Sequence, residues 1–202
     1  MANQRQIPVI QHPDGNVTQL QQNTNKVLRN LSNQIDTLNN TSTSLNSQLS
    51  GIPVKSYLKD IKPSGTNGGA FTSGSWLTRT LNTNENLESW ISLSANQFTL
   101  QPGTYEIYVT APASGVDQHK AKLRNITDSS DVIIGSSEDA RFSDNAQSSS
   151  IIDGKFKITK PIIFEIQHQC ITTQVSVIGF GQASGFGVNE VYTQVEITKV
   201  SG

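Results

Sequence analysis

Residues 27–52 read VLRNLSNQIDTLNNTSTSLNSQLSGI, and this stretch decides how the chain is organised. Apolar residues recur in it every three and four positions, while nearly everything between them is Asn, Ser, Thr or Gln. That spacing places the apolar side chains along one side of a helix. We therefore predict a long amphipathic helix over residues 24–52 that carries hardly any charge.

The apolar positions follow the seven-residue period of a coiled coil, with seven of the eight a and d positions apolar and Ser42 the exception. Asn is a poor helix former, so such a helix depends on packing against partner helices. We predict a stalk of two or three such helices, about 40 Å long from a rise of 1.5 Å per residue. The trimerisation residues would be Leu28, Leu31, Ile35, Leu38, Leu45, Leu49 and Ile52, called the apolar stripe below.

Two readings of the stripe stay open from the residues alone. A stripe this narrow suits a dimer as well as a trimer, and the charged flanking residues that select partners are absent, so the C-terminal region must set the number of chains. The other reading is a single amphipathic helix that packs on the C-terminal domain, although such helices usually carry a wider apolar face.

The helix is bounded by two segments without a period. Residues 1–23 contain a small apolar anchor, Ile7, Val9 and Ile10, which predicts an N-terminal segment that docks on a larger particle; a frayed terminus is the alternative. Gly51-Ile52-Pro53 ends the helix, because Gly caps a helix and Pro cannot extend it. We assign residues 53–69, which include SGTNGG at 64–69, to a linker.

From residue 70 to residue 202 the pattern is that of short strands, about eight or nine in number. Alternation predicts one buried face in each of three segments. These faces are Tyr105, Ile107, Val109 and Ala111; Ile162, Phe164, Ile166, His168 and Cys170; and Val191, Thr193, Val195 and Ile197. The predicted fold class is therefore mainly β with an N-terminal coiled coil, in which the helical stalk precedes an antiparallel jelly-roll β-sandwich.

Composition excludes several classes of function. Charged residues are 15% of the chain and the formal net charge is -1, so no field attracts nucleic acid. No apolar run approaches the roughly 18 residues that membrane insertion requires. The N-terminus lacks the pattern of a secretory signal, and the single Cys170 allows no intrachain disulfide. We expect the protein to be made in a cytoplasm.

The glycine-rich segment SVIGFGQASGFG at 176–187 has the spacing of some dinucleotide loops. That motif needs a following helix whose N-terminus holds the pyrophosphate, whereas a strand follows here. We predict a flexible connection between the last two strands, and no cofactor.

His168 and Cys170 could form a catalytic pair or a metal site, but their alternation with apolar residues predicts a core histidine and a buried thiol. His12 and His119 lie on separate segments, so the case for zinc is weak, although a metal is conceivable if three chains meet at His168. The carboxylate groups Glu138-Asp139, Asp128 and Asp131 fall in polar loops. We predict no catalytic set, and therefore no enzyme.

In HKAKLRN at 119–125, the cations Lys120, Lys122 and Arg124 share one face. A solvated sheet face is the simple interpretation, and a candidate receptor patch for anionic glycans is the alternative. Trp76 and Trp90 are core residues by default, but one exposed on a loop would make a stacking platform for sugar.

Taken together, Leu28–Ile52, FTLQPGTYEIYVTAPA at 98–113 and EVYTQVEITKV at 190–200 carry a resemblance. The chain resembles the short trimeric fibre proteins of bacteriophages, and its C-terminal part looks like the trimeric jelly rolls of the complement-globular and tumour-necrosis-factor-like families. It departs from complement-like heads in its low aromatic content of 6%.

The resemblance implies a virion structural protein, a homotrimeric tail fibre made in the host cytoplasm. Its N-terminus would dock on other virion proteins, and its β head would contact a host surface glycan or protein. The alternative within this class is a capsid-decorating head fibre. A glycan-processing enzyme and a cytosolic adaptor are the alternatives from other classes.

Overall fold

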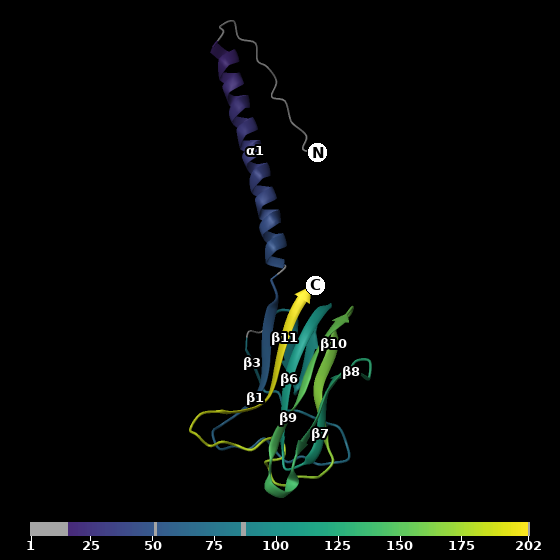
Figure 1. The fold of residues 1–202 in the computed structure, drawn as a ribbon. Helices are drawn as coiled ribbons and strands as arrows, with labels where there is room; N and C mark the ends of the chain where they lie inside the picture. Colours follow the sequence, from purple (N-terminus) through teal and green to yellow (C-terminus); the bar gives the residue numbers. More distant parts are fainter. Residues whose placement is uncertain (1–15, 51, 86–87, 202) are drawn as a thin grey trace. The chain divides into compact units, whose positions relative to one another are not determined.

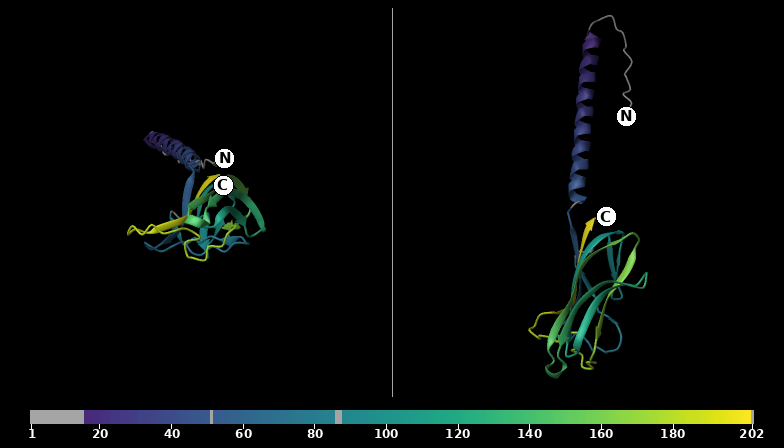
Figure 2. Two further views of the ribbon diagram at one scale, coloured as in Figure 1. Left: turned by 60° about the horizontal axis from the view of Figure 1, so that its bottom comes forward. Right: turned by 45° about the vertical axis from the view of Figure 1, so that its right-hand side comes forward.

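The computed structural model divides the chain into two units, residues 1–50 and residues 51–202, and each is described by itself (Figures 1 and 2). The structure describes residues 16–50, 52–85 and 88–201, with the side chains of all of these except residues 16, 17, 46–50 and 201. In the described part, the first unit is one helix and the second is built mainly from strands.

Helix α1 spans Asn16–Ser50 and has 35 residues, which corresponds to a length of about 52 Å. The predicted start at residue 24 is wrong: residues 16–23 are helical, because extending an existing helix through Gln and Leu needs no apolar period. Four threonine hydroxyls donate to the carbonyl four residues earlier, which satisfies them within the helix. They are Thr24, Thr37, Thr41 and Thr43.

The helix ends at Ser50, directly before Gly51-Ile52-Pro53. Ile52, which we assigned to the last position of the apolar stripe, lies beyond the helix and takes no part in it. The reason is Pro53, since a proline disfavours helical backbone at the residue before it.

The second unit is an antiparallel sandwich of two sheets, shown in Figure 1. One sheet has the strand order β3-β1-β11-β6-β9, and the other has the order β4-β5-β10-β7-β8, with β2 paired to β10 as well. The strands are β1 Val54–Lys62, β2 Leu77–Thr78, β3 Thr83–Glu85, β4 Ile91–Ser94, β5 Gln97–Leu100, β6 Gly103–Ser114, β7 Asp117–Asn125, β8 Ser130–Ala140, β9 Gln147–Ile158, β10 Ile162–Cys170 and β11 Glu190–Ser201, with a short 3₁₀ helix η1 at Phe142–Asp144. The first and last strands are neighbours, as in a jelly roll.

Strand β1 corrects the predicted linker. Residues 54–62 fell within the linker 53–69, but they form a strand between β3 and β11 in the middle of a sheet. The inward side chains of β1 are Ser56, Leu58 and Asp60, all buried. Only one of these three is apolar, so the alternation that marks a half-buried strand is missing from the sequence.

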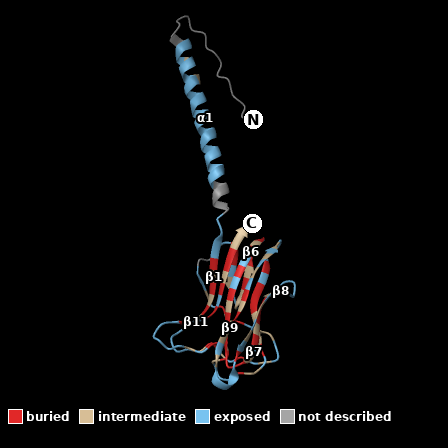
Figure 3. Ribbon diagram, viewed as in Figure 1, coloured by how far each residue is buried: buried red, intermediate tan, exposed pale blue. Residues whose placement is uncertain are grey.

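The alternation in the other strands places the core correctly (Figure 3). All four predicted residues of β6 and all five of β10 are buried. In β11 Thr193, Val195 and Ile197 are buried, but Val191 is 43% exposed. The pairing register between β1 and β11 shifts near this point, and a one-residue shift turns the following side chains to the other face.

The glycine-rich segment does connect the last two strands, but it is held in place by a second glycine-rich segment. Gly68 N–H donates to the Gly181 carbonyl at 2.8 Å, and Phe180 N–H donates to the Gly69 carbonyl at 2.9 Å. A Cβ on Gly179 would lie 2.7 Å from the Cβ of Phe71. Glycine is therefore required here for close approach of two backbones, which is a structural role.

We predict that Gly179→Ala lowers the free energy of unfolding of the β unit by about 2–3 kcal/mol, because the added methyl group overpacks a site walled by Phe71 backbone and Cβ. The matched control is Gly185→Ala, where no atom lies within 4 Å and only the backbone strain at φ +71° acts. The control should cost about 1 kcal/mol. Urea unfolding measures both, and equal losses would contradict the packing argument.

Candidate functional site

A layer of buried polar groups lies between the two sheets, and we call it the buried polar layer. Its members are Arg79 just after β2, His119 on β7, His168 on β10 and Thr193 on β11, each at most 4% exposed. Buried polar groups are costly unless they find partners, so the partners of each decide what this layer can do.

Arg79 is 1% exposed, and it uses its guanidinium to join three parts of the fold. Nε donates to Thr193 Oγ1 at 2.7 Å, Nη1 to the Pro112 carbonyl at 3.0 Å, and Nη2 to the Phe180 carbonyl at 3.0 Å. The guanidinium carbon also lies 4.3 Å from the centre of the Phe180 ring. Burial lowers the pKa of Arg79 to about 9, an effect that the negative charge of Asp60 opposes. Arg79 is therefore a structural cation whose donors are directed at protein acceptors.

The two histidines of the buried polar layer contact each other. His119 Nδ1 and His168 Nε2 are 2.9 Å apart, and His119 Nε2 lies 2.8 Å from Ser148 Oγ. Burial is the main cause that lowers the pKa of His119 to about 4, and burial together with Arg79 holds the pKa of His168 well below its ordinary value. Both imidazoles are therefore neutral at pH 7.

The predicted core histidine and buried thiol are both confirmed: His168 is 0% and Cys170 3% exposed. The position of His119 beside His168 was not predicted, because the pairing of β7 with β10 is not readable from either strand alone. Burial raises the pKa of Cys170 to about 11, and its Sγ lies 3.3 Å from the Thr172 carbonyl. A protonated, buried thiol does not act as a nucleophile.

The carboxylates near the ends of β7 and β8 are engaged in ion pairs. Asp131 accepts from Lys122 and Arg124, and Asp128 accepts from Lys160 at 2.6 Å. These hydrogen bonds hold the pKa of both carboxyls below the ordinary value, so they stay ionised and cannot serve as proton donors near neutral pH. Among the residues that the structure describes, no group of three or more His, Cys, Asp and Glu side chains could hold a metal.

The three cations of the candidate receptor patch all point away from the core on β7, but they differ in their surroundings. Lys122 is 6% exposed, lies 4.1 Å above the Trp76 ring and pairs with Asp131 at 3.0 Å. Arg124 pairs with the same Asp131 at 2.9 Å. Lys120 makes no ion pair with any described residue. A receptor patch at these residues stays a prediction, with Lys120 as its one unpaired cation in the described structure.

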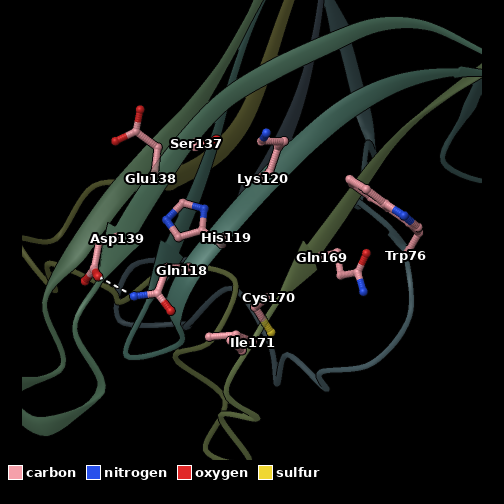
Figure 4. A pocket seen from close by; sticks show the side chains of 10 residues that line it. All are labelled: Trp76, Gln118, His119, Lys120, Ser137, Glu138, Asp139, Gln169, Cys170 and Ile171. Carbon is pink, nitrogen blue, oxygen red and sulfur yellow. Dashed lines mark hydrogen bonds between the residues drawn. The ribbon is translucent and has the colours of Figure 1, made fainter.

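Trp76 and Trp90 have different environments. Trp90 is buried in the core, where its ring lies 5.4 Å from that of Tyr105. Trp76 is partly exposed on the segment before β2 and lines an open pocket of about 630 Å³ on the six-stranded sheet, which we call the Trp76 pocket (Figure 4). Its lining residues are Trp76, Gln118, His119, Lys120, Ser137, Glu138, Asp139, Gln169, Cys170 and Ile171.

A smaller cavity of about 290 Å³ lies on the outer face of the five-stranded sheet. Tyr57 and Tyr108 line it, and Tyr108 is 47% exposed. Charged pairs surround these rings, among them Lys55 with Glu196 and Lys59 with Glu85. This face is therefore a mixed surface with two aromatic side chains and few unpaired charges.

The end of the glycine-rich segment is fixed by Glu190, whose carboxylate accepts from the backbone N–H of Gly65, Ser184 and Gly185. These three bonds hold the pKa of Glu190 below its ordinary value. The N–H groups that would cradle a phosphate are thus occupied by a protein carboxylate, which repels an anion.

Helix α1 leaves its apolar stripe open. Among the stripe residues whose side chains are described, exposure runs from 47% at Leu28 to 67% at Leu38. The side chain of Leu49 and the docking residues Ile7, Val9 and Ile10 lie outside the described residues. In the described part of the chain, no helix is long and apolar enough to cross a membrane.

We predict that the β unit loses stability when the pH falls from 7 to 5. An imidazole of the unfolded chain takes up a proton near pH 6.5, whereas folded His119 does so only near pH 4. Between pH 7 and pH 5 the unfolded state therefore binds more protons than the folded state. The free energy of unfolding decreases as the pH is lowered, and His119 alone accounts for a decrease of about 2 kcal/mol. The lowered carboxylate pKa values act in the same direction only below about pH 5.

The measurement is urea unfolding at several pH values for wild type and His119→Gln. The variant should show a shallower dependence on pH over this window, while His12→Gln, a histidine of the other unit, should keep the wild-type dependence. Asp60 opposes the trend, because burial raises its pKa, so each variant is compared with wild type at the same pH. A wild-type slope that survives in His119→Gln would contradict the assignment.

No protein-family model and no curated protein matches the chain. Solved structures that are similar to it include murine APRIL at pH 8.0, with 10% identity, a TM-score of 0.44, and 73% of this chain and 99% of that chain covered. The globular domain of zebrafish complement 1qA protein has 12% identity and a TM-score of 0.43, with 73% of this chain and 98% of that chain covered. These likenesses concern fold alone.

Proposed function

We propose that the protein is a homotrimeric virion fibre, mounted on a tail by its N-terminal segment, with the β unit contacting the host cell surface. The observation that supports this best is the uncovered apolar stripe of α1. Leu31, Ile35 and Leu45 are 48%, 56% and 59% exposed on a helix of 35 residues. Apolar side chains repeated in this way on a helix are stabilised by burial against like helices.

Further copies of this chain are the occupants that the stripe suits best. The residues of α1 include only three charged side chains, Lys26, Arg29 and Asp36, so the helix has few ion pairs with which to select a different partner. Its exposed face between the apolar positions is Asn, Ser, Thr and Gln, which neither attract nor repel a second copy. Self-association through the stripe is therefore favoured over a specific heterologous contact.

The β unit offers a second surface for self-association. Tyr57 and Tyr108 line the cavity on the five-stranded sheet, and Val191 adds apolar area on β11 of the same sheet. Aromatic side chains with paired charges around them are typical of the centre and rim of protein interfaces. We infer that this face meets its equivalents in the trimer and sets the number of chains.

The chemistry of the site supports a binding role. The thiol is protonated and buried, the two histidines are engaged with each other, and the paired carboxylates stay ionised. The alternative mounting, as a head fibre on the capsid, uses the same stalk and β unit and differs only in the partner of the N-terminal segment.

We predict a mass of about three times 21.9 kDa for the purified chain, and loss of the trimer in Leu38→Asp. Three aspartates facing one axis would be desolvated and mutually repelling, at a cost of several kcal/mol. Light scattering measures the mass, and circular dichroism measures helix and strand content. The matched control is Asn40→Asp, which adds the same charge outside the stripe and should remain trimeric.

A monodisperse monomer of the wild-type chain would contradict the stalk. If Leu38→Asp dissociates the helices and the strand content persists, the two units fold separately. If helix and strand signals disappear together, they form one cooperative unit.

We predict that Ile7, Val9 and Ile10 mount the fibre. Burying each of these side chains on a partner would contribute roughly 1.5–3 kcal/mol before ordering costs, and three chains would add through effective concentration. A variant with all three changed to Ser should still form trimers and bind cells, but it should be absent from purified particles by mass spectrometry. The control changes Gln4, Gln6 and Gln11 to Ser. Normal incorporation of the apolar-to-Ser variant would contradict N-terminal docking.

A further inference from the structure

We propose that the Trp76 pocket is a binding site for neutral saccharides, that is, oligosaccharides of uncharged pyranose rings. The claim that this pocket makes the fibre's contact with the host rests on the proposed function. The claim that the pocket binds a saccharide rests on the arrangement of Trp76, β7, β8 and β10. The pocket volume of about 630 Å³ lies within the range of about 300–1,000 Å³ typical of small-molecule sites.

Trp76 supplies a fixed aromatic wall. Lys122 Nζ lies 4.1 Å from the centre of the ring, and the same ammonium is held by Asp131 at 3.0 Å, so the ring is positioned by an ion pair that is itself anchored on the sheet. The indole is partly exposed and lines the pocket. The face of an aromatic ring carries partial negative charge, which attracts the weakly positive C–H groups on the flat side of a pyranose.

The floor and opposite rim supply unused hydrogen-bonding groups (Figure 4). The Gln169 amide and the Lys120 ammonium make no hydrogen bond with another side chain among the described residues, and both line the pocket next to each other on paired strands. On β8, Asp139 lies on the same outer face as Lys120, and its Oδ2 accepts from Gln118 while its Oδ1 accepts from no described side chain. Glu138 is opposite His119 in the β7–β8 register, so its side chain lies on the other face of the sheet. A sugar hydroxyl both donates and accepts, so it is matched by the amide, the ammonium and the Asp139 carboxylate on the outer face.

Part of the rim is held in place by contacts within the protein. Gln118 Nε2 donates to Asp139 Oδ2 at 3.0 Å across the β7–β8 pair. The backbone below is continuous sheet, since β7 is paired with both β8 and β10. Side chains held on paired strands lose little further entropy on binding. Ile171, 64% exposed at the end of β10, gives the lower wall an apolar surface.

The charges of the pocket select an uncharged ligand. Its lining residues include one cation, Lys120, and two carboxylates, Glu138 and Asp139. The neighbouring cations Lys122 and Arg124 are both paired with Asp131. Lys122, Arg124 and Asp131 together carry one net positive charge, which offsets the one net negative charge of the lining residues. A sialic acid, uronic acid or phosphate would therefore find no net positive charge to attract it, whereas an uncharged sugar needs only hydrogen-bonding groups. This departs from the anionic glycan that the cations of β7 suggest when the sequence is read alone.

The test uses the full-length chain on an array of neutral oligosaccharides of glucose, galactose and their N-acetylated amines, with sialylated and uronic acid oligosaccharides beside them. We expect binding to at least one neutral oligosaccharide and not to its acidic counterparts. Trp76→Ala should weaken that binding by at least about tenfold, and Trp76→Phe, which keeps an aromatic wall, should restore most of it. Gln169→Ala should weaken it too, while Gln182→Ala, in the exposed loop before β11, should leave it unchanged.

Three outcomes would overturn the site: no binding to any neutral oligosaccharide, binding to acidic ones only, or binding that Trp76→Ala leaves intact. Circular dichroism of each variant confirms that its strand content is retained, and Trp76→Phe keeps the test decisive if Trp76→Ala is unstable. Failure of the fibre role looks different. A chain that is absent from purified virions refutes the proposed function whatever the array shows, whereas a chain present on virions whose array binding ignores Trp76→Ala refutes the saccharide site alone.

Discussion

The β unit is organised around one buried cation, the guanidinium of Arg79. A charge with almost no exposure is tolerated only where its donors meet acceptors, and here the acceptors come from β6, from β11 and from the glycine-rich loop. Asp60 on β1 is the nearby anion that opposes the depression of the Arg79 pKa. Two strands of the five-stranded sheet and the glycine-rich segment are thus held to one point at the end of β2, and removing any acceptor would leave a buried donor unpaired.

The same residue fixes the Trp76 pocket without touching it. The Arg79 N–H donates to the Ile166 carbonyl at 2.8 Å, and β2, just before Arg79, pairs with β10 at Gln167 and His168. This short pairing positions Trp76 on the six-stranded sheet, where its ring contacts Lys122 of β7. The pocket therefore depends on a strand of two residues, which backbone pairing holds on β10 and whose end the guanidinium anchors to β6, β11 and Phe180.

The sequence predicts those parts of the fold and of the site that depend on residues close together in the chain. Alternation identifies the buried faces of β6 and β10, because each such strand has an apolar inward face of its own. It fails for β1, whose inward side chains include Ser56 and Asp60, and for Arg79, which stands in the polar run TSGSWLTRT. The contact between His119 and His168 joins residues 49 positions apart and follows only from strand register. The Trp76 pocket likewise combines residues of β7, β8 and β10. The sequence alone therefore singled out Trp76 and the cations of β7 as candidates, but it did not predict the pocket.

Helix α1 shows what a local signal leaves undecided. Its repeat specifies which side of the helix is apolar, but burial of Leu and Ile is non-directional and contributes similarly in two-stranded and three-stranded packing. Charged flanks would normally break that degeneracy, and α1 has only Lys26, Arg29 and Asp36. The near absence of ion pairs also means that salt has little to screen, so association through the stripe changes little with ionic strength. In the proposed trimer the number of chains must then be set by a surface of defined shape, and the surface that we propose for this role is the outer face of the five-stranded sheet, with Tyr57 and Tyr108.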